Sequence, residues 1–307
     1  MSNEEYILRA SIANEATTFQ ASDTAAGYII PEVWSRKIEE FAKANIVLAQ
    51  LGVINTELLG NPGDVVNIAV DAELTAAALT ESVSASISAI SYTQVTVTPS
   101  EQGVAVSVTR KTMERAFNNV MEDQSRIMGY ALAKRKDSLV ASLLAGTAVS
   151  EITANGVATS ALASSDTFDS ALIANGISTM RKNDVQPRYL VIHPACENSL
   201  LKDSNFIDSS KYGGREVVMN GEIGRYLGLQ VFTSTIVPAS ATPTGDVAYD
   251  NFLLGPRAFV IAEKMRPRFD SKYEPLDRAW SLIAVEDYGM SLLNSNHALK
   301  LVAYKGI

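Results

Sequence analysis

The longest regular pattern in this chain is helical and runs from about Thr109 to Gly146. The stretch contains no proline, and Gly146 is a suitable stop. One helix of this length would be about 50 Å long, because each residue adds ~1.5 Å. That exceeds the diameter of a small core, so we expect another large element beside it. The apolar residues that recur on one helical side are Met113, Phe117, Val120, Met121, Ile127, Met128, Ala131, Leu132, Leu139 and Leu143.

Two predicted strands upstream of this helix enclose a long tip. Asp64–Val70 and Tyr92–Thr98 both alternate as strands do, and residues 71–91 between them contain no Gly, Pro, aromatic or basic residue. Loops longer than about 12–15 residues are uncommon inside compact domains. Two strands alone are marginally stable in water. We therefore expect the hairpin to lean on something outside its own fold; the alternative is an ordinary sheet edge with an unsupported tip. A third strand, Gly103–Val108, leads into the helix.

Charge is distributed unevenly along the chain. The net charge is −8, which argues against a general basic surface for nucleic acid. No Lys or Arg lies between Lys43 and Arg110, whereas seven basic residues lie from Arg110 to Lys136. Either these are solvated faces that happen to alternate, or acidic and basic segments meet in neighbouring copies of the chain. The second interpretation gives the candidate assembly residues Asp71, Glu73, Glu81, Arg110, Lys111, Arg115, Arg126, Arg266 and Arg268.

The remaining segments predict an arm, an α/β unit and a set of returning strands. Residues 1–27 are rich in Ala, Ser and Thr and lack a regular period. Pro31 suits the first turn of a helix whose apolar side holds Val33, Ile38, Phe41 and Ile46. Residues 166–240 read as helix, strand, helix and strand, with Asp166 as the expected N-cap of the first helix. Residues 246–307 are rich in strands, which we expect to return and pack beside the long helix.

Catalytic and metal-binding signatures are missing from the sequence. His193 and Cys196 form the best constellation, but a metal would need more ligands, and a nucleophile pair is normally placed on facing elements. We interpret both as structural, and His297 as a turn residue. No phosphate-binding or nucleophile-elbow motif occurs. Near Arg266 and Arg268 we expect local salt bridges in preference to nucleic-acid contacts. The sequence therefore favours a non-enzyme without a cofactor.

Targeting signals are equally missing. The start, MSNEEYILRA, is polar and acidic, so we expect no signal peptide, and no apolar run is long enough to cross a bilayer. The single cysteine excludes an intramolecular disulfide and fits a reducing compartment.

The order of these parts resembles the major capsid protein of tailed bacteriophages, the Hong Kong 97 fold. The likeness rests on PEVW at 31–34, on VTVTPSEQGVAVSVT before the long helix and on KRKDSLV near its end. It implies an α+β fold with an N-terminal arm (1–30) and an extended β-hairpin loop (63–100). The peripheral domain would comprise 31–62, 101–165 with the spine helix, and the returning strands of 241–307. The axial domain would be 166–240.

This resemblance implies function by assembly in the virion capsid, after synthesis in the host cytoplasm. Pentamers and hexamers of the chain would close into an icosahedral shell around double-stranded DNA, without sequence-specific contact and without a membrane. A scaffolding protein, a portal and decoration proteins are the implied partners. Since only about 27 residues precede the first predicted helix, a separate scaffold or prior cleavage is implied.

Covalent welding of subunits and two other functions were also weighed. Some family members link subunits through a lysine of the extended loop, but residues 44–109 contain no lysine, so that bond cannot come from this loop. An encapsulin-type compartment shares the fold and would package enzymes. A cytosolic α/β enzyme is the third alternative, and the missing catalytic constellation weighs against it.

Overall fold

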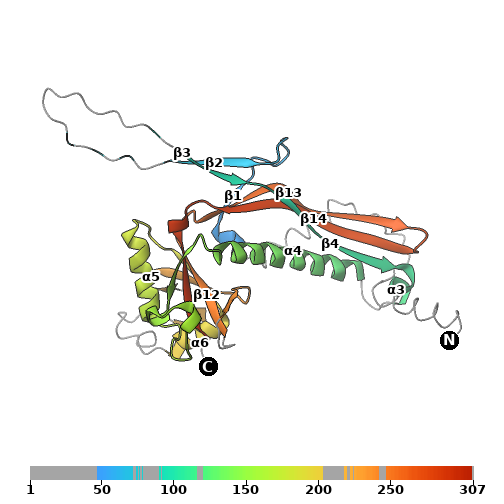
Figure 1. Ribbon diagram of the computed structural model, residues 1–307. Helices are drawn as coiled ribbons and strands as arrows, with labels where there is room; N and C mark the ends of the chain where they lie inside the picture. Colours follow the sequence, from blue (N-terminus) through green and yellow to red (C-terminus); the bar gives the residue numbers. More distant parts are fainter. Residues whose placement is uncertain are drawn as a thin grey trace, which may run out of the picture.

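The computed structural model describes two bodies joined along one long helix (Figure 1). The described residues are 47–71, 74, 76, 78, 90, 92–115, 120–202, 218–219, 222–223, 225–241 and 247–305. The expected arm and the helix after Pro31 lie outside them. The helices and short 3-10 turns are η1 (Ala49–Leu51), α3 (Arg110–Arg115), α4 (Val120–Leu144), η2 (Ala154–Gly156), η3 (Thr159–Ala161), α5 (Ser170–Lys182), α6 (Pro194–Lys202) and η5 (Ser295–His297).

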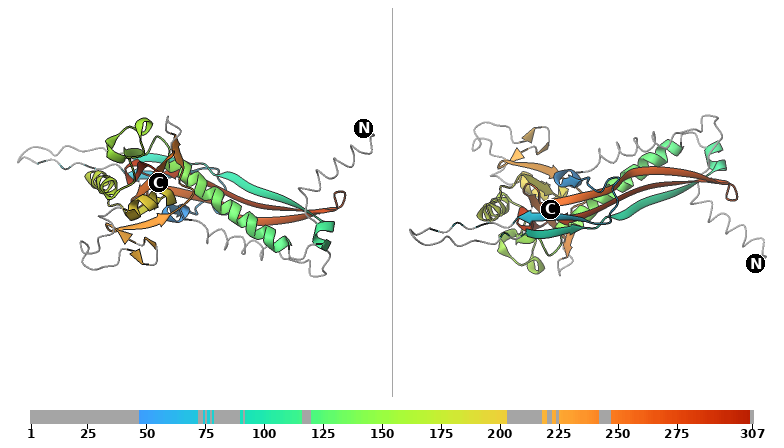
Figure 2. Two further views of the ribbon diagram at one scale, coloured as in Figure 1. Left: turned by 90° about the horizontal axis from the view of Figure 1, so that it is seen from below. Right: turned by 90° about the horizontal axis from the view of Figure 1, so that it is seen from above.

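The elongated body is a four-stranded sheet in the order β1-β13-β14-β4, with α4 lying along it (Figures 1 and 2). Strand β14 pairs with β4 in one unbroken antiparallel register, whereas β13 has register shifts near Met265. Buried Met128 and Leu132 of α4 pack on Val108, Phe269 and Leu282 of the sheet. The strands here are β1 (Val53–Asn55), β4 (Ser100–Thr109), β13 (Phe259–Glu274) and β14 (Ala279–Leu292).

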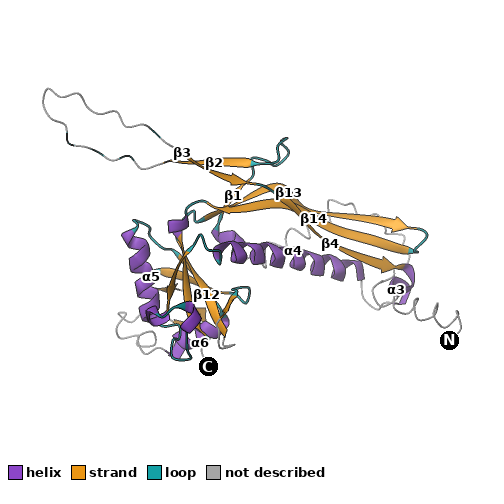
Figure 3. Cartoon of the chain, viewed as in Figure 1, coloured by secondary structure: helices purple, strands orange, loops and turns teal. Residues whose placement is uncertain are grey.

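The compact body is built on a seven-stranded sheet in the order β5-β15-β12-β6-β10-β9, with β11 paired to β12. Ile173 and Met180 of helix α5 pack on this sheet, and Phe168 of the loop before α5 belongs to the same buried cluster. Figure 3 shows this sheet and its helices at one end of α4. Its strands are β5 (Ser150–Thr153), β6 (Tyr189–Ile192), β9 (Arg225–Tyr226), β10 (Leu229–Thr233), β11 (Ala239–Ala241), β12 (Val247–Leu254) and β15 (Ala298–Tyr304).

Two further pairs of strands complete the fold. The expected hairpin is present as β2 (Val66–Asp71) and β3 (Tyr92–Val97), paired antiparallel, while most of its tip lies outside the described residues. In Figure 1 it lies on the side of the sheet opposite α4. The second pair is β7 (Val218–Met219) with β8 (Glu222–Ile223).

A shared core cluster joins the two bodies at the C-terminal end of α4. Val140 and Leu144 of α4 contact Phe252 of the compact sheet and Phe259 of the elongated sheet in one buried group. The helix therefore belongs to both bodies, which makes it the mechanical link between them.

Two sequence-based expectations about helices need correction. In place of one helix over 109–146, the structure describes α3 and α4, with residues 116–119 outside the described part; this interval holds Asn118 and Asn119, poor helix formers. The α5 helix is capped by Asp169, whose Oδ1 accepts the Leu172 N–H at 2.8 Å. Asp166 instead accepts hydrogen bonds from Asn155 and from the Ala163 amide, both at 2.9 Å.

The returning strands divide between the two sheets. The expectation that they pack beside the long helix is correct for β14, which contacts α4 directly, and β13 lies next to β14. Strands β12 and β15, however, pair with each other and join β6 and β5 in the compact sheet. Sequence order alone gives no information on these long-range pairings.

Candidate assembly surfaces and the buried charge network

The acidic candidates lie on or beyond the β2–β3 hairpin. Asp71 is the last residue of β2 and is paired in register with Tyr92 of β3. Glu73 and Glu81 lie outside the described residues. The base of the hairpin is tied to the elongated sheet by an ion pair between Asp64 and the Lys264 ammonium, 2.7 Å apart. This contact lowers the pKa of the Asp64 carboxyl, chiefly through its hydrogen bond to Lys264.

The basic candidates lie on α3, α4 and β13. The Arg110 guanidinium pairs with Glu114 one turn along α3, at 2.8 Å, and both side chains are exposed. Lys111 is exposed on α3, and Arg115 is the last residue of that helix. Arg126 is exposed on α4.

The two remaining basic candidates, Arg266 and Arg268, lie two residues apart on strand β13. Arg266 is exposed, and Arg268 pairs with Asp270 at 3.0 Å, also on the surface. Exposed pairs of this kind contribute about 0–1 kcal/mol each. The expected local salt bridge is therefore present at Arg268, and it leaves the side chain accessible.

Among the described candidates, Asp71 at the end of β2 and the basic residues of α3 lie in different parts of the chain. The hairpin rises near the junction with the compact body, whereas α3 lies at the far end of α4, beside the β13–β14 turn (Figure 1).

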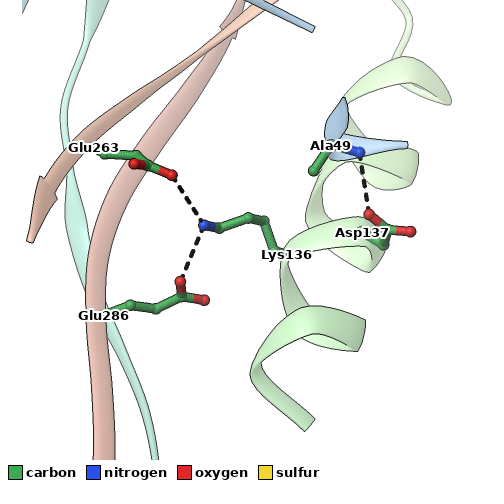
Figure 4. A network of polar contacts seen from close by, with 5 residues as sticks. All are labelled: Ala49, Lys136, Asp137, Glu263 and Glu286. Atoms are coloured by element: carbon green, nitrogen blue, oxygen red, sulfur yellow. Dashed lines mark hydrogen bonds and ion pairs between the residues drawn. The ribbon is translucent and has the colours of Figure 1, made fainter. Parts of the chain in front are cut away.

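A buried ion-pair network lies outside the residues that the sequence predicted. The Lys136 ammonium of α4 lies 3.0 Å from Glu286 Oε2 of β14 and 3.4 Å from Glu263 Oε1 of β13 (Figure 4). The Lys136 side chain is 8% exposed and that of Glu286 3%. The ammonium also lies 4.7 Å from the ring centroid of Tyr288, a cation–π contact. One buried cation thus faces two carboxylates and ties the helix to both central strands.

Burial governs the protonation of this network. Desolvation raises the pKa of Glu286 above its ordinary value, while the charge of Lys136 opposes the rise. Burial also raises the pKa of the Tyr288 hydroxyl, and the neighbouring Glu286 adds to that effect. Glu286 Oε1 and the Tyr288 hydroxyl are buried without a hydrogen-bond partner. The network is therefore sensitive to any loss of its single cation.

The adjacent residue, Asp137, anchors the chain segment that arrives at α4. Its carboxylate accepts the backbone N–H groups of Val47, Leu48 and Ala49 at 3.0, 3.3 and 3.1 Å. Burial raises the pKa of Asp137, and these three hydrogen bonds oppose the rise. Figure 4 shows the two side chains leaving the helix on different sides. One turn of α4 therefore holds both the sheet and the incoming chain.

The sequence contains a signal that Lys136 is buried, but its charge favoured the interpretation that it lies on the surface. Leu132, Lys136 and Val140 are spaced four apart, and all three are buried. A charged residue on the line of an apolar helical stripe indicates a buried partner. The sequence does not identify that partner, because Glu263 and Glu286 are far along the chain.

The His193–Cys196 constellation lies beside buried Asn251. The Asn251 Oδ1 accepts the backbone N–H of His193 at 2.9 Å, and its Nδ2 donates to Cys196 Sγ at 3.5 Å. The His193 ring stacks on Tyr249 with 3.7 Å between centroids. Burial raises the pKa of the Cys196 thiol to about 11, which disfavours the reactive thiolate at neutral pH. His297 ends the η5 turn, in agreement with the prediction.

Metal and membrane signatures are missing from the part of the chain that the structure describes. No group of three or more His, Cys, Asp or Glu side chains there could hold a metal ion. None of the helices described above combines the length and apolar character needed to span a membrane.

Comparison with known proteins gives one family and a consistent set of folds. A family model described as phage capsid protein matches residues 92–294. No curated protein matches the chain. Among solved structures, the capsid of Ralstonia phage GP4 has a TM-score of 0.69 at 14% identity, covering 84% of this chain and 88% of its own. The capsid of cyanophage Pam1 has 0.67 at 14%, covering 93% and 95%. Mycobacterium phage Che8 has 0.65 at 19%, covering 83% and 90%.

Proposed function

The chain belongs to the phage capsid protein family, and on this premise we propose that it is the major subunit of an icosahedral shell, assembled as pentamers and hexamers around double-stranded DNA. It is a structural component of the virion and not an enzyme. The observation that carries the proposal is the family match over residues 92–294, which includes α4 and most strands of both sheets.

We assign the parts of the Hong Kong 97 fold as follows. The elongated body with α4 as its spine is the peripheral domain, and the β2–β3 hairpin with residues 63–100 is the extended loop. The compact body is the axial domain. Strand pairing supports extending this domain beyond 166–240 to include β5, β12 and β15, because these strands complete its sheet. Residues 1–30 are assigned to the N-terminal arm.

Contacts between copies follow from where the charges lie. The extended loop of one subunit, with Asp71, Glu73 and Glu81, would lie over basic residues of a neighbour, among them Arg266 and Arg268. Each exposed pair contributes about 0–1 kcal/mol. Many such contacts repeated over a closed shell sum to a large total while each remains reversible, which allows errors to be corrected during closure.

The DNA partner is held without sequence-specific contact. With a net charge of −8, the chain has no general excess of cations to neutralise phosphates. This leaves the packaged DNA free to be ejected. A strongly positive inner surface in the assembled shell would contradict this part of the proposal. A scaffolding protein, a portal and decoration proteins complete the proposed partners.

Negative-stain electron microscopy of the expressed chain, alone and with its scaffold, tests the function. Closed hollow shells that enclose DNA when isolated from infected cells are expected. A chain that stays monomeric even with scaffold present would refute the assembly proposal. Shells that enclose proteins in place of DNA would favour the encapsulin-type alternative.

A charge reversal tests the assembly surface itself. Arg266→Glu combined with Arg268→Glu is expected to lower shell yield and leave the thermal unfolding of the subunit unchanged, because both side chains are exposed. Lys182→Glu, on the exposed end of α5, is the matched control and should assemble normally. Equal yields for the two variants would remove Arg266 and Arg268 from the interface.

A further inference from the structure

His193 lies at the junction between strand β6 and helix α6 and caps the helix. The His193 carbonyl accepts the N–H groups of Cys196 and Glu197 at 2.9 and 3.1 Å, which are the first hydrogen bonds of the helix. Pro194 occupies the first helical position, where its missing N–H is not needed. The ring Nδ1 of His193 accepts the Ala195 N–H at 3.1 Å. The imidazole thus takes the role that a Ser, Thr, Asp or Asn side chain usually has at a helix N-terminus.

This hydrogen bond determines the protonation state of the ring. A backbone N–H can only donate, so the His193 Nδ1 carries no proton, and the ring is the neutral tautomer with its proton on Nε2. An imidazolium carries a proton on both nitrogens. Its Nδ1–H would face the Ala195 N–H, and its charge would lie at the positive end of the helix dipole. The cap therefore exists only while His193 is neutral.

The packing around the ring holds it in the capping position. One face of His193 stacks on Tyr249 of β12, with 3.7 Å between the ring centroids and 6° between the planes. Asn251 of the same strand holds the backbone, because its Oδ1 accepts the His193 N–H at 2.9 Å. Burial lowers the pKa of His193 below its ordinary value of 6.5, because it disfavours the charged form. The backbone, the ring face and Nδ1 are thus all held in the one geometry that caps α6.

The titratable groups around the ring come from α6 and β12. On α6 they are Cys196 and Glu197, and burial raises the pKa of both. On β12 the ring of Tyr249 lies against His193. Asp250 follows Tyr249 in the strand, so its side chain lies on the opposite face of the sheet. Glu197 is therefore the carboxylate whose titration has to be separated from that of His193.

Helix α6 depends on its cap more than α5 does. It is nine residues long, and isolated helices shorter than about 12–15 residues are marginal in water. Its buried residues are Cys196 and Leu200, which belong to the core cluster of the compact body. Helix α5 has thirteen residues, of which five are buried. Loss of the cap should therefore loosen α6 before α5.

We propose that His193 is an acid-sensitive cap, whose protonation releases α6 from the compact sheet. A histidine whose pKa is lower in the folded state than in the unfolded state makes its full contribution to stability above the unfolded-state value, here 6.5. That contribution is lost as the pH falls through the folded-state pKa. The release therefore begins below pH 6.5, reverses on neutralisation and uncovers Cys196 and Leu200. The proposal stands on the geometry of the cap and does not rest on the proposed shell function.

The reactivity of Cys196 reports the release, because it is the only cysteine of the chain and lies buried on α6. The full-length, unassembled subunit is mixed with an aromatic disulfide reagent that reacts with thiols in mild acid, from about pH 7.5 to about pH 5. Each rate is divided by that of the denatured subunit at the same pH, which cancels the pH dependence of thiolate formation. On acidification this ratio should rise by about tenfold, the size expected for the loss of one N-cap.

Three variants assign the response to one side chain. His193→Asn keeps a capping oxygen that does not titrate, so its ratio should stay constant on acidification. His297→Asn is the matched control, because His297 is the other histidine of the chain and its ring contacts the Pro256 carbonyl; it should keep the full response. Glu197→Gln should keep it as well. A response that persists in His193→Asn, or that disappears in Glu197→Gln, would overturn the proposal.

Hydrogen exchange of the unmodified subunit gives a second measurement that needs no substitution. After correction for the intrinsic exchange rate at each pH, the amides of α6 should lose protection on acidification, while those of α5 keep it. Equal loss in both helices would indicate general unfolding in acid, and unchanged protection of α6 would show that the cap holds. Either result would overturn the proposal.

Discussion

Replacing Lys136 by methionine removes the only cation of a buried three-residue network. The substitution keeps an unbranched side chain of similar length, so little packing is lost. It leaves Glu286, 3% exposed in its side chain, and Glu263, 18% exposed, facing each other without a counter-ion. Breaking a buried pair in this way costs about 3–5 kcal/mol. Since domains are stable by only about 5–15 kcal/mol, the subunit should be strongly destabilised.

The free energy of unfolding that Lys136→Met loses depends on pH, because the charge of Glu286 depends on pH. Burial already raises the pKa of Glu286, and Lys136 opposes that rise, so the pKa in Lys136→Met is expected to be higher still. A carboxyl whose pKa is higher in the folded state than in the unfolded state makes its full contribution to stability when the pH is below the unfolded-state pKa. That contribution is lost as the pH rises through the folded pKa. The deficit of Lys136→Met should therefore be largest at neutral pH and shrink as the pH falls towards the ordinary value of 4.5.

Urea unfolding followed by circular dichroism, at neutral pH and at mildly acidic pH, measures both effects. Adding Glu286→Gln to Lys136→Met removes the stranded charge and should recover much of the lost stability at neutral pH. Lys134→Met, on the exposed side of the same helix, is the control and should change the free energy of unfolding by about 0.5 kcal/mol or less. A Lys136→Met deficit below about 1 kcal/mol, or one independent of pH, would refute the reasoning.

Three further outcomes are expected. Gly289→Ala should lower the unfolding temperature, at a cost of about 1–3 kcal/mol, because its Cβ would lie 2.5 Å from the Thr98 carbonyl oxygen; an unchanged melting curve would contradict this. Cys196 should not react with a thiol reagent at pH 8 until the subunit is denatured, since it is fully buried with a pKa of about 11; rapid labelling of the native subunit would argue against its burial. Boiled shells should run as a single band of monomer mass on a denaturing gel, because residues 44–109 offer no lysine for an isopeptide bond; a ladder of covalent oligomers would refute this.

Local patterns predicted much of the fold. The alternation of Tyr92–Thr98 and the proline that opens α6, Pro194, correspond to a strand and a helix of the structure, because each signal depends on neighbouring residues. The helix and strand order of residues 166–240 predicted an α/β unit, and this unit forms part of the compact body, whose sheet also contains β5, β12 and β15. The limits of α4 were less accurate, since periodicity registers the apolar stripe and gives little weight to poor helix formers such as Asn118.

Long-range pairing is the part that local patterns could not predict. Strand β12 precedes β13 directly in the chain, yet the two belong to different sheets. The partners of Lys136 lie more than a hundred residues away, on strands whose register is fixed only when the sheet forms. The sequence supplied the charges of the assembly candidates, and the structure supplied positions for those among the described residues.

Lys136 and Asp137 together explain how one helix holds a fixed position between two bodies. Apolar contacts alone tolerate sliding, because one buried leucine or valine can replace another a turn away. Sliding α4 by one turn would instead bury Glu286 without its cation and leave three backbone N–H groups at 47–49 without their acceptor. Each loss costs on the order of 1–5 kcal/mol, more than the packing difference between neighbouring registers. We infer that the Lys136–Glu286 ion pair and the Asp137 hydrogen bonds fix the register of α4 more than they add to stability. A fixed register suits a subunit whose spine must present the same contacts in every copy.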